Sequence, residues 1–261
     1  MLVLLPPSEG KAVGGTGGAV ALESLSLPGL TGARAAVLDE LVELCAGDEE
    51  KAAEVLGLSP GLRGEVAKNA GLRTAPAMPA AELYTGVLYD ALGLATLGRA
   101  ARRRAEESLL VFSGLWGAVR LDDRIPSYRC SMGVRLPGAG GLAAYWRRHM
   151  DAVLPEIAGD GLVLDLRSSS YAGAWKPAGE LARRTATVRV LQVTEVDGVE
   201  KRTVVSHFNK ATKGRLVRAL LQSTARPKDP AGLARTLRRL GFTVEEQPGV
   251  GRLDVLVREI H

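Results

Sequence analysis

The chain has 261 residues, of which 46% are hydrophobic and 24% are charged, and its formal net charge is +5. This length and apolar content are enough for a folded globular protein with a sizeable core. No apolar run reaches the roughly 18 residues that a membrane helix needs, and the start from Met1 to Pro6 lacks the basic segment of a signal peptide. We therefore expect a cytoplasmic protein that has no contact with a membrane.

The cysteine and histidine positions give no sign of a disulfide framework or a metal site. Cys45 and Cys130 lie far apart without a CxxC pair, and His149, His207 and His261 form no ligand-spaced cluster. Aromatic residues make up only 4% of the chain, which argues against a surface that binds single strands mainly by stacking bases. We predict no metal and no cofactor.

The first half of the chain is mostly helical in its pattern. Residues 1–5 predict a short buried strand, which runs into Pro6 and Pro7 and then into a glycine-rich loop that ends at Gly18. A second strand is expected at 109–112. Between the two strands, apolar spacing predicts helices at about residues 38–45, 48–56, 80–92 and 99–107.

The second half combines strands and helices. The apolar run at 163–166 predicts a strand that opens onto a polar loop, and loops at strand ends often carry function. Alternation from 187 to 208 predicts two strands joined by a hairpin at Asp197-Gly198. Helices are expected at about 210–222 and 230–240, followed by two closing strands.

These segregated helices and antiparallel strands predict an α+β fold. We expect a single compact mixed-sheet domain over residues 1–261, with a mainly helical subregion at 31–108. No linker, internal repeat or low-complexity segment is long enough to divide the chain.

Positive charge is concentrated near the end of the chain. From Lys201 to Arg239 there are eleven Lys or Arg residues against one acidic residue, Asp229. A surface of one sign attracts polyanions, so the block predicts a phosphate-bearing partner. The alternative is a solvated helical face that binds nothing.

Lys11 is the strongest single candidate for a site, because it follows a strand and a Pro-Pro turn and is itself followed by glycines. The segment is not a phosphate-binding P-loop, since Ala12 follows Lys11 and Leu5 stands at the place of the first glycine. Ser8 and Lys11 satisfy the SxxK spelling of serine acyl enzymes, but the partner motifs of that class are missing. Ser113 lacks the glycine that a nucleophile elbow needs, so an ordinary tight turn explains it better.

Two further segments carry candidate residues. Tyr128 and Arg129 form a loop that holds a guanidinium fork beside a phenol, and Arg129 binds either an anion or, internally, Asp122 or Asp123. On the helix from 210, Lys213 falls within the apolar arc, so it either extends from the edge of the core or projects into a cleft. A cleft would lower its pKa.

Six sequence blocks stand in the order found in one known family: residues 4–11 (LLPPSEGK), 84–86 (YTG), 113–117 (SGLWG), 126–129 (PSYR) with 132–133 (MG), 165–168 (DLRS) with Tyr171, and 208–210 (FNK) with 213–214 (KG). On these blocks the chain resembles the YaaA family of peroxide stress response proteins, also called UPF0246. The resemblance covers nearly the full length. It implies a mixed α/β fold with a basic cleft, a helix-hairpin-helix element, DNA binding, and a cytoplasmic role in limiting oxidative damage by restraining free iron.

The helix-hairpin-helix element has one candidate position. Leu56-Gly57-Leu58 supplies a hydrophobic-Gly-hydrophobic hairpin, which residues 52–55 and 62–66 could flank. Such a hairpin would direct backbone N–H groups at a phosphate. The alternative is a plain packing corner between two helices.

The sequence leaves two biochemical functions open, beside a stress protein that binds a partner and has neither of these activities. The first is non-specific binding of double-stranded DNA through a basic cleft, in protection against oxidative stress. The second is an enzyme that acts on a nucleotide, nucleoside or other small anionic ligand, with Lys11 as nucleophile or clamp. The candidate anion-binding residues are Ser8, Lys11, Arg129, Arg167, Lys210 and Lys213, and the candidate catalytic residues are Lys11, Tyr128, Ser168 and Tyr171.

Overall fold

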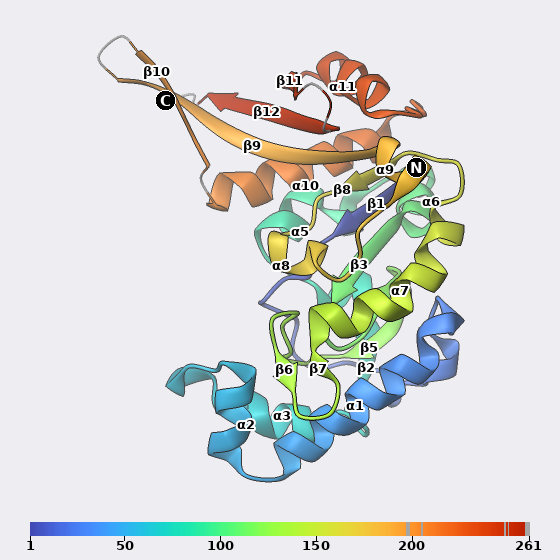
Figure 1. Cartoon of the computed structure of the whole chain (residues 1–261), viewed down its shortest axis with the longest axis vertical. Helices are drawn as coiled ribbons and strands as arrows, with labels where there is room; N and C mark the ends of the chain where they lie inside the picture. The colour runs from blue at the N-terminus through green and yellow to red at the C-terminus, as the bar shows by residue number, and fades with distance from the viewer. Residues whose placement is uncertain (197–198, 205, 248, 250, 259–261) are drawn as a thin grey trace.

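A mixed β-sheet runs through the protein in the computed structural model, which describes residues 1–196, 199–204, 206–247, 249 and 251–258 (Figure 1). In order across the sheet, the strands are β11 (Thr243–Gln247), β12 (Arg252–Arg258), β9 (Thr185–Val196), β8 (Val163–Asp165), β1 (Leu2–Leu5), β3 (Leu109–Ser113) and β4 (Gly117–Val119), and β10 (Val199–Thr203) pairs with β9. All neighbours from β12 to β3 are parallel, whereas β11, β10 and β4 pair antiparallel. The predicted α+β fold with a mixed sheet is confirmed.

The central strands are continuous apolar runs because both of their faces are covered. Every residue of β1 and of β3 is buried. Strands buried on both sides gain nothing from polar alternation, and this is why the pattern at 1–5 and 109–112 is uninterrupted. The antiparallel β10 differs, since it is exposed over most of its length.

Helices cover the sheet and extend one end of the molecule (Figure 1). They are α1 (Thr31–Ala46), α2 (Glu49–Leu56), α3 (Gly64–Ala70), α4 (Ala80–Leu83), α5 (Val87–Leu92), α6 (Arg99–Ser108), α7 (Leu142–Ala158), α8 (Ser169–Ala172), α9 (Gly179–Arg183), α10 (Ser206–Gln222) and α11 (Pro230–Arg239). Short 3-10 turns lie at Leu22–Ser24, Pro28–Leu30, Pro60–Leu62 and Leu94–Thr96. Two small hairpin sheets pair β2 (Ala77–Pro79) with β5 (Arg124–Pro126), and β6 (Arg135–Leu136) with β7 (Gly140–Gly141). None of the helices in the described ranges has the length and apolarity needed to cross a membrane.

Several elements differ from the expectation. The helix predicted at 80–92 is two helices, α4 and α5, because the chain turns at Gly86 with φ +92°. The second strand of the predicted 187–208 pair ends at Thr203, and α10 begins at Ser206. The strands β9 and β10 pair as a hairpin, but its predicted turn at Asp197-Gly198 lies outside the described residues.

The segment proposed as a helix-hairpin-helix forms two short helices around a turn. Gly57 ends α2 in the left-handed region with φ +64°, and Leu58 donates its N–H to the carbonyl of Ala53 at 2.9 Å. The 3-10 turn at Pro60–Leu62 then leads into α3. This is a helix end of the glycine-capped kind followed by a corner. Its role in binding a phosphate stays a prediction.

The order of strands places one crevice at the centre of the sheet. The chain leaves β1 on one side to form β3, and later returns to the other side of β1 to form β8. The loops after β1 and β8 therefore start from the same edge and diverge. In open parallel sheets, ligands bind outside the carboxyl ends of the strands at such a switch point.

Candidate functional site

A pocket of about 720 Å³ opens at the carboxyl ends of β1 and β8. Its lining comprises residues 6–11, 85–89, 129–131, 133, 166, 168, 170, 171, 209, 210 and 213. Four of these side chains are basic: Lys11, Arg129, Lys210 and Lys213. Glu9 is the one carboxylate in the described lining. The pocket thus presents a net positive surface built from segments that lie far apart in the sequence.

Lys11 is held in the pocket wall by its backbone. An isolated antiparallel bridge joins Lys11 to Tyr84, and the N–H of Ala12 donates to the carbonyl of Leu83 at 2.9 Å. The Nζ of Lys11 donates to the carbonyl oxygen of Ser8 at 3.0 Å and lies 4.5 Å from the centre of the Tyr128 ring. The amine therefore rests on an aromatic floor.

The surroundings of Lys11 disfavour its charged form. Burial lowers the pKa of Lys11 to about 8, and the nearby guanidinium of Arg129 contributes to that lowering. Glu65 and Glu9 act weakly in the opposite direction. A pKa near 8 leaves an appreciable fraction of the amine neutral near physiological pH, which an ordinary surface lysine does not offer.

Lys213 reaches the same pocket from α10. Its Nζ donates to the carbonyl oxygen of Leu166, at the end of β8, at 3.2 Å. Burial lowers the pKa of Lys213, and the charge of Asp165 partly offsets this effect. From the sequence, Lys213 could either extend from the edge of the core or project into a cleft. In the structure it projects into the pocket, which Lys11 also lines.

Arg129 forms a different ion pair from the internal pairs considered above. Its guanidinium lies 3.3 Å from the carboxylate of Glu9, and it also donates to the carbonyl of Glu9. Asp123 instead accepts from the N–H groups of Ser26 and Arg120. Since Glu9 is exposed, this pair can open to admit an anion at low cost.

The other nucleophile types around the pocket have local roles. The hydroxyl of Ser8 donates to the carbonyl of Gly10 and accepts from the N–H of Thr85, while Lys11 faces the carbonyl of Ser8 and not its hydroxyl. Ser8 also stands in a loop, so the SxxK chemistry lacks its geometry. Burial raises the pKa of the Cys130 thiol to about 12, which keeps it protonated and weakly reactive. Lys11 is therefore the best nucleophile in this wall.

Tyr128 lies beneath Lys11 and outside the pocket lining. Its hydroxyl lies 2.6 Å from that of Ser113 and 2.9 Å from that of Tyr84, and all three side chains are buried. Burial raises the pKa of Tyr128 well above its ordinary value. The phenol therefore stays neutral and acts as a hydrogen-bonded support of the floor.

Ser113 organises the turn after β3. Its Oγ accepts hydrogen bonds from the N–H of Leu115 at 3.2 Å and of Trp116 at 2.9 Å. We expect Ser113→Ala to lower the free energy of unfolding by about 2 to 4 kcal/mol, because two buried donors lose their acceptor. Urea unfolding, followed by tryptophan fluorescence, measures this loss. Ser168→Ala is the matched control, since Ser168 is exposed and, among the described residues, its hydroxyl bonds only to that of Ser170. Equal stability of the two variants would contradict the assignment.

Arg167 was expected to bind an anion, but the structure places it elsewhere. Its guanidinium lies 2.6 Å from the carboxylate of Asp165, donates to the carbonyls of Tyr171 and Trp175, and stacks 4.2 Å from the ring centre of Phe112. Only 7% of the residue is exposed, and it does not line the pocket. Arg167 is a structural cross-link for the loop after β8.

That loop brings Ser168 and Tyr171 to the pocket, where both line the wall. Burial raises the pKa of Tyr171 to about 12. At neutral pH Tyr171 is thus a hydrogen-bond donor and not a base. Lys210 also lines the pocket and is exposed, so it is free to follow a ligand.

Asn209 is a pocket residue that we did not select from the sequence. Its side-chain Oδ1 is buried without a hydrogen-bond partner among the described residues. The only signal was its place between Phe208 and Lys210 in the last of the six blocks. Within the described part of the chain, no three His, Cys, Asp or Glu side chains gather as metal ligands would.

Comparison with known proteins agrees with the resemblance seen in the sequence. The sequence model of the family described as "Peroxide stress protein YaaA" matches residues 1–248. A UPF0246 protein of Streptomyces coelicolor is 68% identical over 266 residues, covering 100% of each chain. A UPF0246 protein of Corynebacterium efficiens is 43% identical over 251 residues, covering 95% of this chain and 96% of the relative. The chain belongs to the peroxide stress protein YaaA family.

Proposed function

We propose that this member of the peroxide stress family binds double-stranded DNA through the phosphate backbone, with little sequence preference. The observation that carries the proposal is the pocket with four basic side chains and one exposed carboxylate, at the carboxyl ends of β1 and β8. Contacts to phosphate need positive charge and N–H donors and carry no sequence information. In the family role that the resemblance implies, such binding would serve to limit iron-dependent oxidative damage to DNA.

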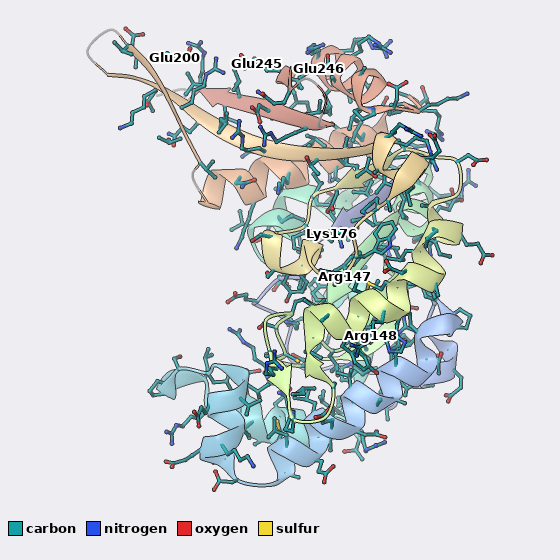
Figure 2. All side chains as sticks on the ribbon, viewed as in Figure 1. Arg147, Arg148, Lys176, Glu200, Glu245 and Glu246 are labelled. Carbon is teal, nitrogen blue, oxygen red and sulfur yellow. The ribbon has the colours of Figure 1, made fainter. Side chains whose placement is uncertain are left out.

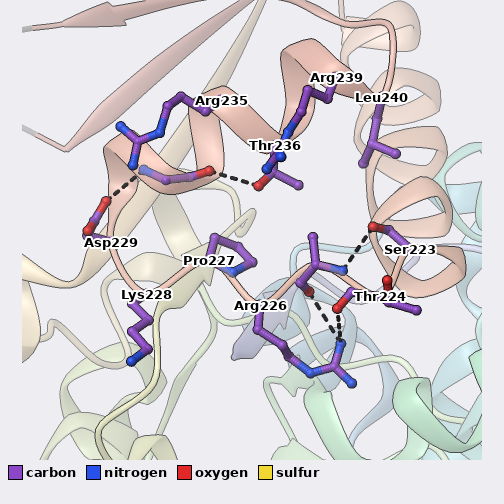
Figure 3. A pocket seen from close by; sticks show the side chains of 12 residues that line it. Ser223, Thr224, Arg226, Pro227, Lys228, Asp229, Arg235, Thr236, Arg239 and Leu240 are labelled. Atoms are coloured by element: carbon purple, nitrogen blue, oxygen red, sulfur yellow. Dashed lines mark hydrogen bonds between the residues drawn. The ribbon is translucent and has the colours of Figure 1, made fainter.

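A second basic hollow supports a contact longer than one small ligand. It measures about 640 Å³ and lies between the end of α10 and α11 (Figure 3). Arg226, Lys228, Arg235 and Arg239 line it, and none of them has a carboxylate within ion-pair distance among the described residues. Asp229 is the N-cap residue of α11, and its carboxylate accepts a hydrogen bond from the N–H of Gly232 at 2.6 Å.

Other members of the basic block are committed within the protein. Arg202 pairs with Glu200 and Glu245, and Arg238 pairs with Glu246, at the end of the molecule where Figure 2 labels the three carboxylates. Arg218 donates to the carbonyls of Leu92 and Gly93. The surface available to phosphates is therefore narrower than the count of eleven basic residues suggests.

Helix α10 connects the pocket at the ends of β1 and β8 with the hollow beside α11. Lys210 and Lys213, near the start of the helix, line the pocket, and Ser223, just after its end, lines the hollow. At 1.5 Å per residue, Lys210 and Ser223 are about 20 Å apart along the helix axis. Arg215 is exposed between them. This spacing exceeds a single nucleotide and suits a polymer that carries repeated phosphates.

The test is the dependence of DNA affinity on salt. We expect the affinity for an intact duplex to fall steeply as the salt concentration rises. In a variant with glutamine at positions 226, 235 and 239, the slope of log K against log salt should be shallower by about 0.9 for each phosphate that the variant no longer neutralises. Fluorescence anisotropy measures both quantities. Arg73→Gln is the control, because Arg73 is paired with Asp39 at the helical end of the protein. Absence of binding at low salt would refute the proposal.

A second candidate function rests on Lys11 alone. A half-buried amine whose pKa is lowered to about 8, in a pocket that also presents Ser168 and Tyr171, suits an enzyme acting on a nucleotide, nucleoside or other small anionic substrate. Charge alone would be supplied as well by an exposed lysine. The partial burial of Lys11 is thus the observation that favours a chemical role over simple attraction of an anion.

A further inference from the structure

We propose that Lys11 is an imine-forming nucleophile, and that its partner is the aldehyde carbon of a phosphate-bearing substrate held in the pocket at the ends of β1 and β8. In DNA, the carbon of this kind is C1′ of a deoxyribose that has lost its base. The assignment of the aldehyde to DNA rests on the proposed function. The imine chemistry itself does not, because a free phosphorylated aldehyde offers the same two groups.

The contacts of Lys11 leave its nitrogen available. Its one hydrogen bond in the described structure is to the carbonyl of Ser8, and no carboxylate among the described residues lies within ion-pair distance. The Tyr128 ring, whose centre is 4.5 Å away, lies beneath the amine and outside the pocket lining, so it does not block the pocket. A lysine kept only to attract phosphate gains nothing from this burial, since desolvation weakens its charge.

The protonation state of Lys11 fits a nucleophile. Burial and the charge of Arg129 lower its pKa to about 8, so the neutral amine is populated at a pH where ordinary lysines are protonated. A desolvated lysine beside a second cation is one of the known ways in which proteins activate an amine for attack on a carbonyl. Lys213, in the same pocket, adds a further positive charge.

The rest of the pocket suits a phosphate next to the carbonyl. Arg129 and Lys210 line the wall with exposed or half-buried cationic groups, and the pocket volume of about 720 Å³ admits a sugar phosphate. Tyr171 lines it as a neutral donor. In duplex DNA the sugar would have to turn out of the helix, and this costs least where the base is already lost.

The reaction balances without a cofactor or redox partner. The lone pair of neutral Nζ attacks the aldehyde carbon, so that a C–N bond forms and the carbonyl oxygen takes up a proton. The carbinolamine then loses its C–O bond. Both hydrogens of the amine leave with the oxygen as water, and a C=N bond remains.

Reductive trapping tests the inference. The protein is incubated with a labelled duplex that contains one abasic site, and separately with glyceraldehyde 3-phosphate, each with cyanoborohydride, which reduces the imine to a stable amine. Denaturing gels and peptide mapping locate the adduct. We expect it on Lys11, with a loss of about tenfold or more in Lys11→Arg and no loss in Lys176→Arg. Lys176 is exposed and lies outside the pocket lining.

The outcomes separate the inference from the proposed function. An adduct of Lys11 with the abasic duplex supports the DNA source, and an adduct with glyceraldehyde 3-phosphate alone supports the imine with a small substrate. Binding of the wild-type protein to an intact duplex is measured in parallel by anisotropy. If the protein does not bind this duplex but still forms the adduct with glyceraldehyde 3-phosphate, only the proposed function is refuted. No adduct with either probe, or adducts spread equally over many lysines of the wild-type protein, overturns the inference. Because the adduct is mapped on wild-type protein, this result does not depend on how the variants fold.

Discussion

Gly214→Ala is expected to lower the free energy of unfolding by about 2 to 4 kcal/mol, because helices α10 and α5 touch at this glycine. A Cβ on Gly214 would lie 2.2 Å from the carbonyl oxygen of Leu88, 2.9 Å from the Cβ of Ala91 and 3.0 Å from the backbone N of Leu92. These partners are backbone or short side chains and cannot rotate away. The helical preference of alanine over glycine, about 0.5 to 1 kcal/mol, is too small to compensate.

The matched control is Gly32→Ala on α1. Gly32 is exposed, and a Cβ there would meet nothing within 4 Å. We expect this variant to be unchanged or stabilised by up to about 1 kcal/mol. Urea unfolding of both variants measures the difference. Equal stabilities would show that α10 and α5 do not approach as closely as described, and the position of Lys213, the residue before Gly214, would lose its support.

The sequence predicts best the elements whose pattern is local. The strands β1 and β3 were found from apolar runs, since burial on both faces removes every polar position. The placement of Lys213 also followed from local geometry, because a rotation of 100° per residue puts it on the apolar arc of α10. A charged side chain on such an arc needs a special environment, and the pocket supplies it.

One long helix escaped the prediction although its pattern is also local. Helix α7 buries Leu142, Trp146, Met150 and Leu154, which recur at every fourth position. Two features obscure this spacing: basic residues lie between the apolar ones, and Pro155 lies in the last turn of the helix. The apolar residues of the segment, taken alone, would have predicted a helix.

The assembly of the pocket could not be predicted in the same way, because it depends on strand order. Nothing near β1 shows that β8, about 160 residues later, will lie beside it. The pair between Arg129 and Glu9 likewise joins residues that are far apart in the sequence. The role of Arg167 was misjudged although its ionic partner Asp165 is two residues away and its acceptor Trp175 is eight residues away; only Phe112, on β3, reaches it through the strand order.

Lys11→Met is expected to stabilise the protein at pH 7 while abolishing imine trapping. Burial lowers the pKa of Lys11 from 10.5 to about 8, so folding disfavours the charged amine by about 3 kcal/mol below pH 8. Methionine fills a similar volume without charge. Loss of the bond to Ser8 and of the interaction with the Tyr128 ring offsets about 1 to 2 kcal/mol, which leaves a net gain of about 1 to 2 kcal/mol.

The dependence on pH identifies the cause. Between pH 8 and 10.5 the unfolded wild-type chain holds more protons than the folded one, so the stability of the wild type rises with pH in this window. The advantage of Lys11→Met should therefore be full below pH 8, shrink as the pH rises above 8, and become a deficit of about 1 to 2 kcal/mol by pH 10.5, where only the lost contacts remain. Urea unfolding of both proteins from pH 6 to 10.5 measures this, with Lys176→Met as the control that shows no such trend. A constant difference across this range would mean that Lys11 is not desolvated in the folded protein. If the gain fades in this way, and if the wild type is trapped as an imine while Lys11→Met is not, the chain keeps a destabilising amine at this position for its chemistry.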